Sequence, residues 1–454
     1  MGRPTSWLPN VHDVPSRTSH AVRVAVLADS DTRWKWGSLT ARRIAPEKRD
    51  TELSGFLLRG RATPTARQLA EVGAELDAPR EMTGVEFLTH LRNESYDVVV
   101  LALVGGAVQA MLHGIAALEL PRRPLVVTGY VGVVYEKLSD GLLLRHGADI
   151  VLANSRYDAE RFRDVYEGVG ADASSVTEAA LPFLAGARYV PEEGRDTVVF
   201  AAQPSVPVSR ADRTYVLKRL AEHARLHPGR EVLLKLRSKP GEQTTHIEEF
   251  PYQKLAERLP GGLPPNFKLV YGHMGEVLDR TDLLVTVSST AALESLHRRI
   301  PTAILTDLGI REPLGNHHFI GSGCLASWDQ LDGGYRPEAD AVWAGRQGVA
   351  AADGAYETAF DEARAHVEEL LDAPGLPRLR PYYTATTAPG YLPPLLARYH
   401  LAADGTPLPG ARTEPADNSR MRRAVREAVR GAARGAYRHG VQRVAPVIRR
   451  MGEL

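Results

Sequence analysis

Three consecutive hydroxyl residues, Ser288, Ser289 and Thr290, lie where a short apolar run gives way to a helical pattern. The run at 283–287 is too short for a buried helix and rich in β-formers, so it predicts a strand of a parallel sheet. Residues 291–299 then predict a helix. Hydroxyls and free backbone N–H groups at the start of such a helix bind phosphate well. The alternative is an ordinary helix N-cap without a ligand.

Polar and basic side chains also follow two neighbouring predicted strands. Gln203 and Ser205 come after the first of them, and Lys235, Arg237 and Lys239 lie at the end of the second. Because adjacent parallel strands open into one crevice at their carboxyl ends, we expect these residues to converge with the hydroxyl triplet. The cations would supply positive charge for a monophosphate or diphosphate. As a charge run alone, they would predict a solvated face instead.

Two carboxylates, Asp29 and Asp31, follow the first predicted strand at 22–28. This end of a strand is where open α/β sheets keep their ligands, so either residue could be the general base that deprotonates an acceptor hydroxyl. The alternative is that one of them caps a helix beginning near Ser38. The strand is not followed by a G-x-G-x-x-G motif, which argues against a dinucleotide site.

Two glycine-bearing segments could contact the sugar or the acceptor. Gly132 follows a further predicted strand and would allow close approach of a ligand or another backbone. Glu136 could bind an acceptor, or be a solvated or capping residue. The loop 314–323 is rich in glycine and hydrogen-bonding groups, so Asn316 and His318 could close over the donor sugar.

Strands alternate with helices along most of the chain, which predicts an α/β fold with two Rossmann-like, doubly wound domains. Near the end of the second domain we expect 328–347 to be irregular and 350–371 to form one or two helices. The expected units are a flexible N-terminus at 1–20, a first domain at 21–190, a second domain at 195–400, a linker at 401–417 and a helical tail at 418–454.

The tail at 418–454 is strongly basic, with ten arginines against two glutamates. Its valines and alanines recur near helical spacing, which predicts a basic amphipathic helix suited to an anionic membrane surface. A solvated helix or a docking arm for a protein partner fits the pattern equally well. Nucleic-acid binding is not expected, because the tail has few aromatic residues.

Composition sets the remaining bounds. The 454 residues are 43% hydrophobic and 24% charged, with a net charge of +1, as in ordinary globular proteins. The single cysteine, Cys324, excludes a disulfide framework and fits a cytoplasmic protein. Residues 1–20 lack the apolar core of a signal peptide. We expect no metal site, since adjacent His317 and His318 would point to opposite sides of an extended chain.

The stretch from Asp282 through the hydroxyl triplet to Glu294, followed by a basic-Ile-Pro turn, resembles the donor half of GT-B glycosyltransferases. The UDP-sugar 2-epimerases share this element. The resemblance implies a GT-B arrangement, with an acceptor-side first domain and a nucleotide-sugar donor domain. It also implies that the hydroxyl turn holds the donor phosphates, that Glu294 binds the ribose, and that His273 and Glu276 contact the base.

Two motifs resemble bacterial capsule glycosyltransferases that use CMP-activated acids, the Kdo transferases and the polysialyltransferase group. Gln203-Pro204 and the hydroxyl triplet match their QP and SS/ST motifs. The His-Pro motif expected after the next strand is replaced by Ser238-Lys239-Pro240-Gly241. In that group this histidine touches the cytidylate phosphate, and here His246 or His273 could substitute for it.

Together these features predict a glycosyltransferase that needs no metal or other cofactor, because helix N-termini and cations can stabilise a leaving phosphate. The expected donor is a CMP-linked nonulosonate or Kdo-type sugar, and the expected acceptor is a cell-surface glycan or a lipid-linked hydroxyl. The predicted location is the cytoplasm, at the inner membrane face. The alternatives are a UDP-sugar 2-epimerase and a non-catalytic glycan-binding protein at the membrane. The Gly-Thr-Arg-Pro pattern of the epimerases is absent, with Asp29-Ser30-Asp31-Thr32-Arg33 in its place.

Overall fold

The computed structural model describes residues 21–47, 49–60, 62–72, 79–133, 138–239, 242, 248–349 and 355–411. The following parts of the sequence predictions lie outside these residues: the N-terminus at 1–20, Glu136, Pro240-Gly241, His246, the end of the predicted linker at 412–417 and the tail at 418–454.

The first domain is built on a seven-stranded, fully parallel sheet with the strand order β3-β2-β1-β4-β5-β6-β7. The chain reverses its winding direction between β1 and β4, which is the point where open α/β sheets bind ligands. The strands are β1 (Val22–Ala28), β2 (Thr51–Leu58), β3 (Arg80–Met82), β4 (Val98–Ala102), β5 (Leu125–Gly129), β6 (Ile150–Ala153) and β7 (Val176–Glu178). The helices are α1 (Asp31–Arg43), α2 (Ala66–Glu71), α3 (Gly84–Asn93), α4 (Gly105–Ala117), α5 (Leu138–Leu143) and α6 (Arg156–Gly168).

The second domain repeats this plan with a six-stranded parallel sheet in the order β10-β9-β8-β11-β12-β13. Its strands are β8 (Thr197–Ala201), β9 (Glu231–Lys235), β10 (Phe267–Val270), β11 (Leu283–Thr286), β12 (Thr302–Leu305) and β13 (Leu325–Ala326). Its helices are α7 (Arg210–Leu226), α8 (Tyr252–Ala256), α9 (Met274–Leu278), α10 (Ala291–His297), α11 (Trp328–Asp332) and α12 (Ala341–Arg346), with 3₁₀ turns η1 (Glu312–Leu314) and η2 (Asn316–Phe319).

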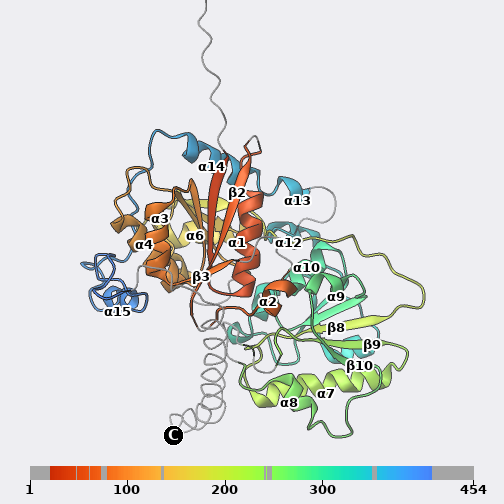
Figure 1. Ribbon diagram of the computed structural model, residues 1–454. Helices are drawn as coiled ribbons and strands as arrows, with labels where there is room; N and C mark the ends of the chain where they lie inside the picture. Colours follow the sequence, from red (N-terminus) through yellow and green to blue (C-terminus); the bar gives the residue numbers. More distant parts are fainter. Residues whose placement is uncertain are drawn as a thin grey trace, which may run out of the picture.

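The chain then returns to the first domain through α13 (Ala355–Thr358), α14 (Asp361–Asp372) and α15 (Leu392–Ala397). Helix α14 packs against β7 and β5, and α15 packs against α4. Figure 1 shows α14 and α15 beside the first sheet, on the far side of the molecule from α7 and α8.

Each sheet has an apolar cluster on both faces, because alternate strand residues point to opposite sides. In β1, Leu27 joins one cluster and Val26 the other, and in β8 Phe200 and Val199 divide in the same way. The cluster around Val26 also includes Leu293 of α10. The second domain is therefore joined to the first by shared apolar packing as well as by its connecting chain.

The predicted first strand at 22–28 is confirmed with its bounds. Helix α1 begins at Asp31 and not near Ser38, with Ser30 as its N-cap, so neither aspartate caps a helix there. The prediction that 328–347 is irregular is wrong, because α11 and α12 lie within it. Each begins at a capping side chain, Ser327 or Asp340.

Among the described residues, none of the helices combines the length and apolar character that a bilayer span requires.

Candidate active site

A pocket of about 860 Å³ lies where the carboxyl ends of the two sheets face each other. Both domains supply its walls, as expected for ligand sites at the winding reversals of open α/β sheets. The lining segments are 31–33 after β1, 130–133 after β5, 201–206 at the end of β8, 235–237 at the end of β9, 272–274 after β10, 289–291 after β11 and 312–315 after β12.

Lys235, the last residue of β9, lines this pocket with only 9% of its surface exposed. Its Nζ donates to the Leu236 carbonyl at 2.9 Å, and among the described residues no carboxylate forms an ion pair with it. Burial lowers the pKa of its ammonium group to about 8. A buried ammonium group without an ion-pair partner is unfavourable, so an anion entering the pocket here would be stabilised.

Arg237 extends from the same strand end to the first domain. Its guanidinium donates to Asp31 Oδ1 at 2.7 Å and contacts Thr32 Oγ1. This ion pair crosses the pocket, because Asp31 and Thr32 begin α1. A guanidinium here can also bind a phosphate in bidentate fashion.

The hydroxyl triplet divides into a structural residue and two residues at the pocket. Ser288 is fully buried, and its Oγ donates to the Leu314 carbonyl at 2.5 Å. Ser289 and Thr290 line the pocket. Thr290 is the N-cap of α10 without a side-chain capping bond, whereas Ser289 Oγ accepts from the Ala291 N–H at 3.2 Å.

The loop after β8 is held in place by a buried arginine. Arg213 donates to the carbonyls of Gln203, Pro204 and Pro207 at 3.1, 3.2 and 3.3 Å. Gln203 Oε1 in turn accepts from the Ser288 N–H at 3.1 Å, which ties this loop to the triplet. Gln203 and Ser205 both line the pocket, as predicted from their position after the strand.

Glu294 of α10 lines the pocket beside Lys35 of the first domain, with Oε2 and Nζ 3.9 Å apart. Burial raises the pKa of this carboxyl group. The Lys35 ammonium also lies 4.8 Å from the centre of the Phe183 ring. The pair is a second charged contact between the two domains inside the pocket.

His273 and Glu276, the predicted base contacts, have different environments. His273 lines the pocket just before α9, and burial together with nearby Lys35 lowers its pKa. Glu276 is exposed on the first turn of α9 and does not line the pocket.

Of the two candidate bases, only Asp31 lines the pocket. Asp29 lies behind it, where Oδ1 accepts from Arg33 at 3.0 Å and Oδ2 accepts from the Val104 N–H at 3.0 Å. Asp29 therefore links the end of β1 to α1 and to the start of α4.

Gly132 lies directly against Thr290 at the pocket, since a Cβ placed on it would lie 2.7 Å from Thr290 Oγ1. Asn316 and His318 do not line the pocket. The Asn316 amide is used within its own loop, where it donates to the carbonyls of Leu305 and Gly309 and accepts from the Arg311 N–H. His318 packs against Tyr157 and Trp343, and burial lowers its pKa to about 4.

A family model described as "Putative glycosyltransferase (DUF6716)" matches residues 24–370, which include both sheets. The chain belongs to this family. Among curated proteins there is no match to this DUF6716 chain.

Two solved structures have a similar fold. One is a putative UDP-N-acetylglucosamine 2-epimerase from Listeria monocytogenes, with 12% identity and a TM-score of 0.50, covering 80% of the DUF6716 chain and 100% of that chain. The other is S. aureus MnaA with UDP, with 10% identity and a TM-score of 0.51, covering 78% and 99%. At such identities they show the fold alone. The predicted fold class, two Rossmann-like units in a GT-B-like arrangement, is confirmed for the described residues.

Three cations at the pocket of this DUF6716 chain were not predicted from its sequence: Arg33, Lys35 and Arg145. Arg33 and Lys35 lie two and four residues after Asp31, so a predicted helix start at Asp31 would have placed both at the pocket. Arg145 is buried, donates to the carbonyls of Gly129, Gly141 and Leu103, and stacks on Tyr130. A lone arginine in an apolar segment does not indicate a pocket residue.

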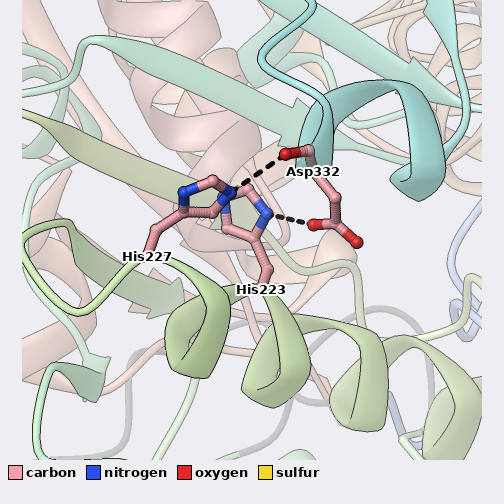
Figure 2. Close-up of side chains that lie close together, drawn as sticks. All are labelled: His223, His227 and Asp332. Carbon is pink, nitrogen blue, oxygen red and sulfur yellow. Dashed lines mark hydrogen bonds and ion pairs between the residues drawn. The ribbon is translucent and has the colours of Figure 1, made fainter.

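Outside the pocket, His223, His227 and Asp332 form a cluster with metal-ligand spacing at the junction of α7 and α11 (Figure 2). His223 Nε2 lies 2.9 Å from an Arg230 N–H donor, so this nitrogen is the acceptor and Nδ1–H donates to Asp332 at 2.5 Å. A metal ion bound to Nδ1 would require the ring proton to be on Nε2, where it would face the Arg230 N–H donor. The cluster therefore suits a hydrogen-bonded junction between helices better than a metal site.

Proposed function

We propose that this DUF6716 chain transfers a sugar from a nucleotide-activated donor to an acceptor hydroxyl in the pocket between its two domains. The family supports a glycosyltransferase. The observation that supports the donor site is Lys235, a nearly buried ammonium group that lines the pocket without an ion pair among the described residues.

In this proposal the second domain binds the donor. Lys235, Arg237, Ser289 and Thr290 line the same pocket and together offer two cations and two hydroxyls to a phosphate group. The two cations would also stabilise the negative charge that develops on the leaving phosphate. The proposed reaction needs no metal ion, because these side chains can provide that stabilisation.

The first domain would supply the acceptor side. Asp31 is the proposed general base, because it is the candidate aspartate that lines the pocket. The segment around Gly132 lies against Thr290 at the pocket and would form part of the wall around the sugar.

We propose a CMP-activated acidic sugar as the donor to test first, on the Gln203-Pro204 and hydroxyl-triplet motifs. His273 lines the pocket, and we propose that it replaces the missing motif histidine. A UDP-linked sugar is the competing donor, because a protein of similar fold, S. aureus MnaA, was solved with UDP.

The acceptor is proposed to be a surface glycan or lipid-linked hydroxyl on the inner membrane face. The ten arginines of the 418–454 tail support this location, since each basic residue near an anionic surface contributes about 1 kcal/mol of attraction.

The test is to incubate the purified chain with CMP-linked acidic sugars and with UDP-N-acetylglucosamine, with and without bacterial membranes as acceptor. Chromatography follows free nucleotide and sugar products. We expect membrane-stimulated release of nucleotide that Lys235→Ala abolishes. Lys268→Ala, a lysine that pairs with Glu231 outside the pocket, should leave it unchanged. Epimerised UDP-sugar formed without an acceptor would support a 2-epimerase instead, and no turnover of any donor would contradict the proposal.

A further inference from the structure

Arg237 forms an ion pair with Asp31, the proposed base of this site. All the hydrogen bonds that Asp31 accepts within the described residues fall on one oxygen, Oδ1. The Thr32 N–H donates at 2.8 Å, the Thr32 hydroxyl at 3.2 Å and the Arg237 guanidinium at 2.7 Å. The carboxylate oxygen that is fixed by the start of α1 is therefore also covered by a cation from the opposite domain.

The two partners of this ion pair differ in how firmly they are held. Asp31 has 10% of its side chain exposed and is fixed by its own helix start. The Arg237 side chain is 31% exposed and lies on the loop after β9. Among the described residues it contacts Asp31 and Thr32, both on the other side of the pocket. Arg237 is thus the partner that can move.

A phosphate in the pocket would compete for the same guanidinium. Lys235 lies two residues away without an ion-pair partner among the described residues, so it would draw an anion to the strand end from which Arg237 projects. A phosphate offers a guanidinium two parallel charge-assisted bonds, whereas Asp31 presents Arg237 with one oxygen. A bound phosphate would therefore favour an exchange of partners.

We propose that Arg237 is a positioning residue with two alternative partners, Asp31 in the empty pocket and the donor phosphate in the loaded one. Donor binding then removes the cation from Asp31, so this carboxylate becomes more basic toward the acceptor hydroxyl when a donor is present. This inference rests on the proposed donor site.

The test is a double-mutant cycle read by calorimetric binding of CMP and UDP to the full chain. Asp31→Asn keeps the shape of the side chain and removes the competing charge, so the tighter-binding nucleotide should bind about 3- to 10-fold more tightly. In an Arg237→Ala background the same change should alter affinity by less than about 2-fold, because the competition is gone. Glu160→Gln, which removes a carboxylate that pairs with Arg346 outside the pocket, is the control for the change in net charge and should also change affinity by less than about 2-fold.

If the ion pair were purely structural, breaking it would weaken nucleotide binding or leave it unchanged. Unchanged or weaker binding by a folded Asp31→Asn protein, or an equal gain in the Arg237→Ala background, would overturn the inference while leaving the donor site in place. Failure of the wild-type chain to bind either nucleotide would overturn both. Melting temperatures of all variants establish that each is folded.

Discussion

Lys235 is the residue on which the donor site depends most. Its ammonium group lies at the end of a buried strand, and its one hydrogen-bond partner among the described residues is a backbone carbonyl. Desolvation lowers its pKa to about 8, so near neutral pH the group is still mostly charged. A phosphate would supply a direct ion-pair partner and raise that pKa again.

This makes a prediction about pH. Binding of the nucleotide should be strongest below pH 8, where Lys235 is charged, and should fall by up to tenfold per pH unit above it until the pKa of the bound state is reached. Calorimetric titrations between pH 6.5 and 9.5, a range chosen around that pKa, would measure the affinity for the nucleotide. Lys235→Arg is the matched control, because an arginine remains charged throughout this range. A wild-type profile as flat as that of the arginine variant would contradict the role of Lys235.

At the level of elements, the buried parallel strands could be predicted from sequence because they are continuous apolar runs bounded by polar residues. Strand β1 has its predicted bounds for this reason. The edge strands β3, β7 and β13 have three residues or fewer, too short to show any periodicity. The predicted start of α1, near Ser38, is later than the observed start at Asp31. Two tryptophans follow Asp31, and their burial against the sheet depends on tertiary packing.

Helix α1 carries Asp31 and Lys35 to the pocket, and Gly37 lets it lie close to the sheet. A Cβ at Gly37 would lie 2.8 Å from both Ala102 Cβ and Val26 Cγ1. We expect Gly37→Ala to lower the free energy of unfolding by up to about 2 kcal/mol, since overpacking costs about 1–3 kcal/mol and the gain in helix propensity returns about 1. Urea denaturation measures this. Gly168→Ala, at a helical glycine with open space around it, should be neutral or stabilising. Equal effects at both positions would contradict the packing argument.

The junction of α7 and α11 gives a second prediction at this scale. Asp332→Ala leaves the buried His223 Nδ1–H without an acceptor and should cost about 1–3 kcal/mol of stability. Nucleotide binding should be unaffected, because none of these residues lines the pocket. The measurements are thermal denaturation with and without added zinc, and nucleotide titration. Zinc that raises the melting temperature of the wild type but not of the variant would show a metal site in place of a hydrogen-bonded junction.

At the scale of the whole molecule, the pocket exists because two sheets meet at their carboxyl ends. Charged contacts join the domains around it: Asp31 with Arg237, Lys35 with Glu294, and Arg67 with Glu242. Residues next to strand ends, such as Gln203 and Lys235, could be placed at the pocket from sequence because topology brings strand ends together. Asn316 and His318 could not, because the path of a loop beyond a strand depends on packing that no periodicity encodes.

The tail gives a prediction for the intact chain. The full-length protein should co-sediment with vesicles containing anionic lipid and not with neutral vesicles, and added salt should release it, since surface attraction is screened within about 10 Å at 0.1 M salt. A chain ending at residue 411 should lose this binding while it retains nucleotide affinity. Equal binding of the shortened chain would contradict the proposed role of the tail.

The central claim, that the pocket binds a nucleotide through Lys235, is tested most directly by calorimetric titration of CMP, CDP, UDP and GDP into the wild type, Lys235→Ala and Lys268→Ala. We predict that one nucleotide binds the wild type and the Lys268 variant with equal affinity. Lys235→Ala should bind it about 10- to 100-fold more weakly, which corresponds to the loss of one charge-assisted bond of about 1.5–3 kcal/mol. Binding that is the same in all three proteins, or absent from the folded wild type, would contradict the account.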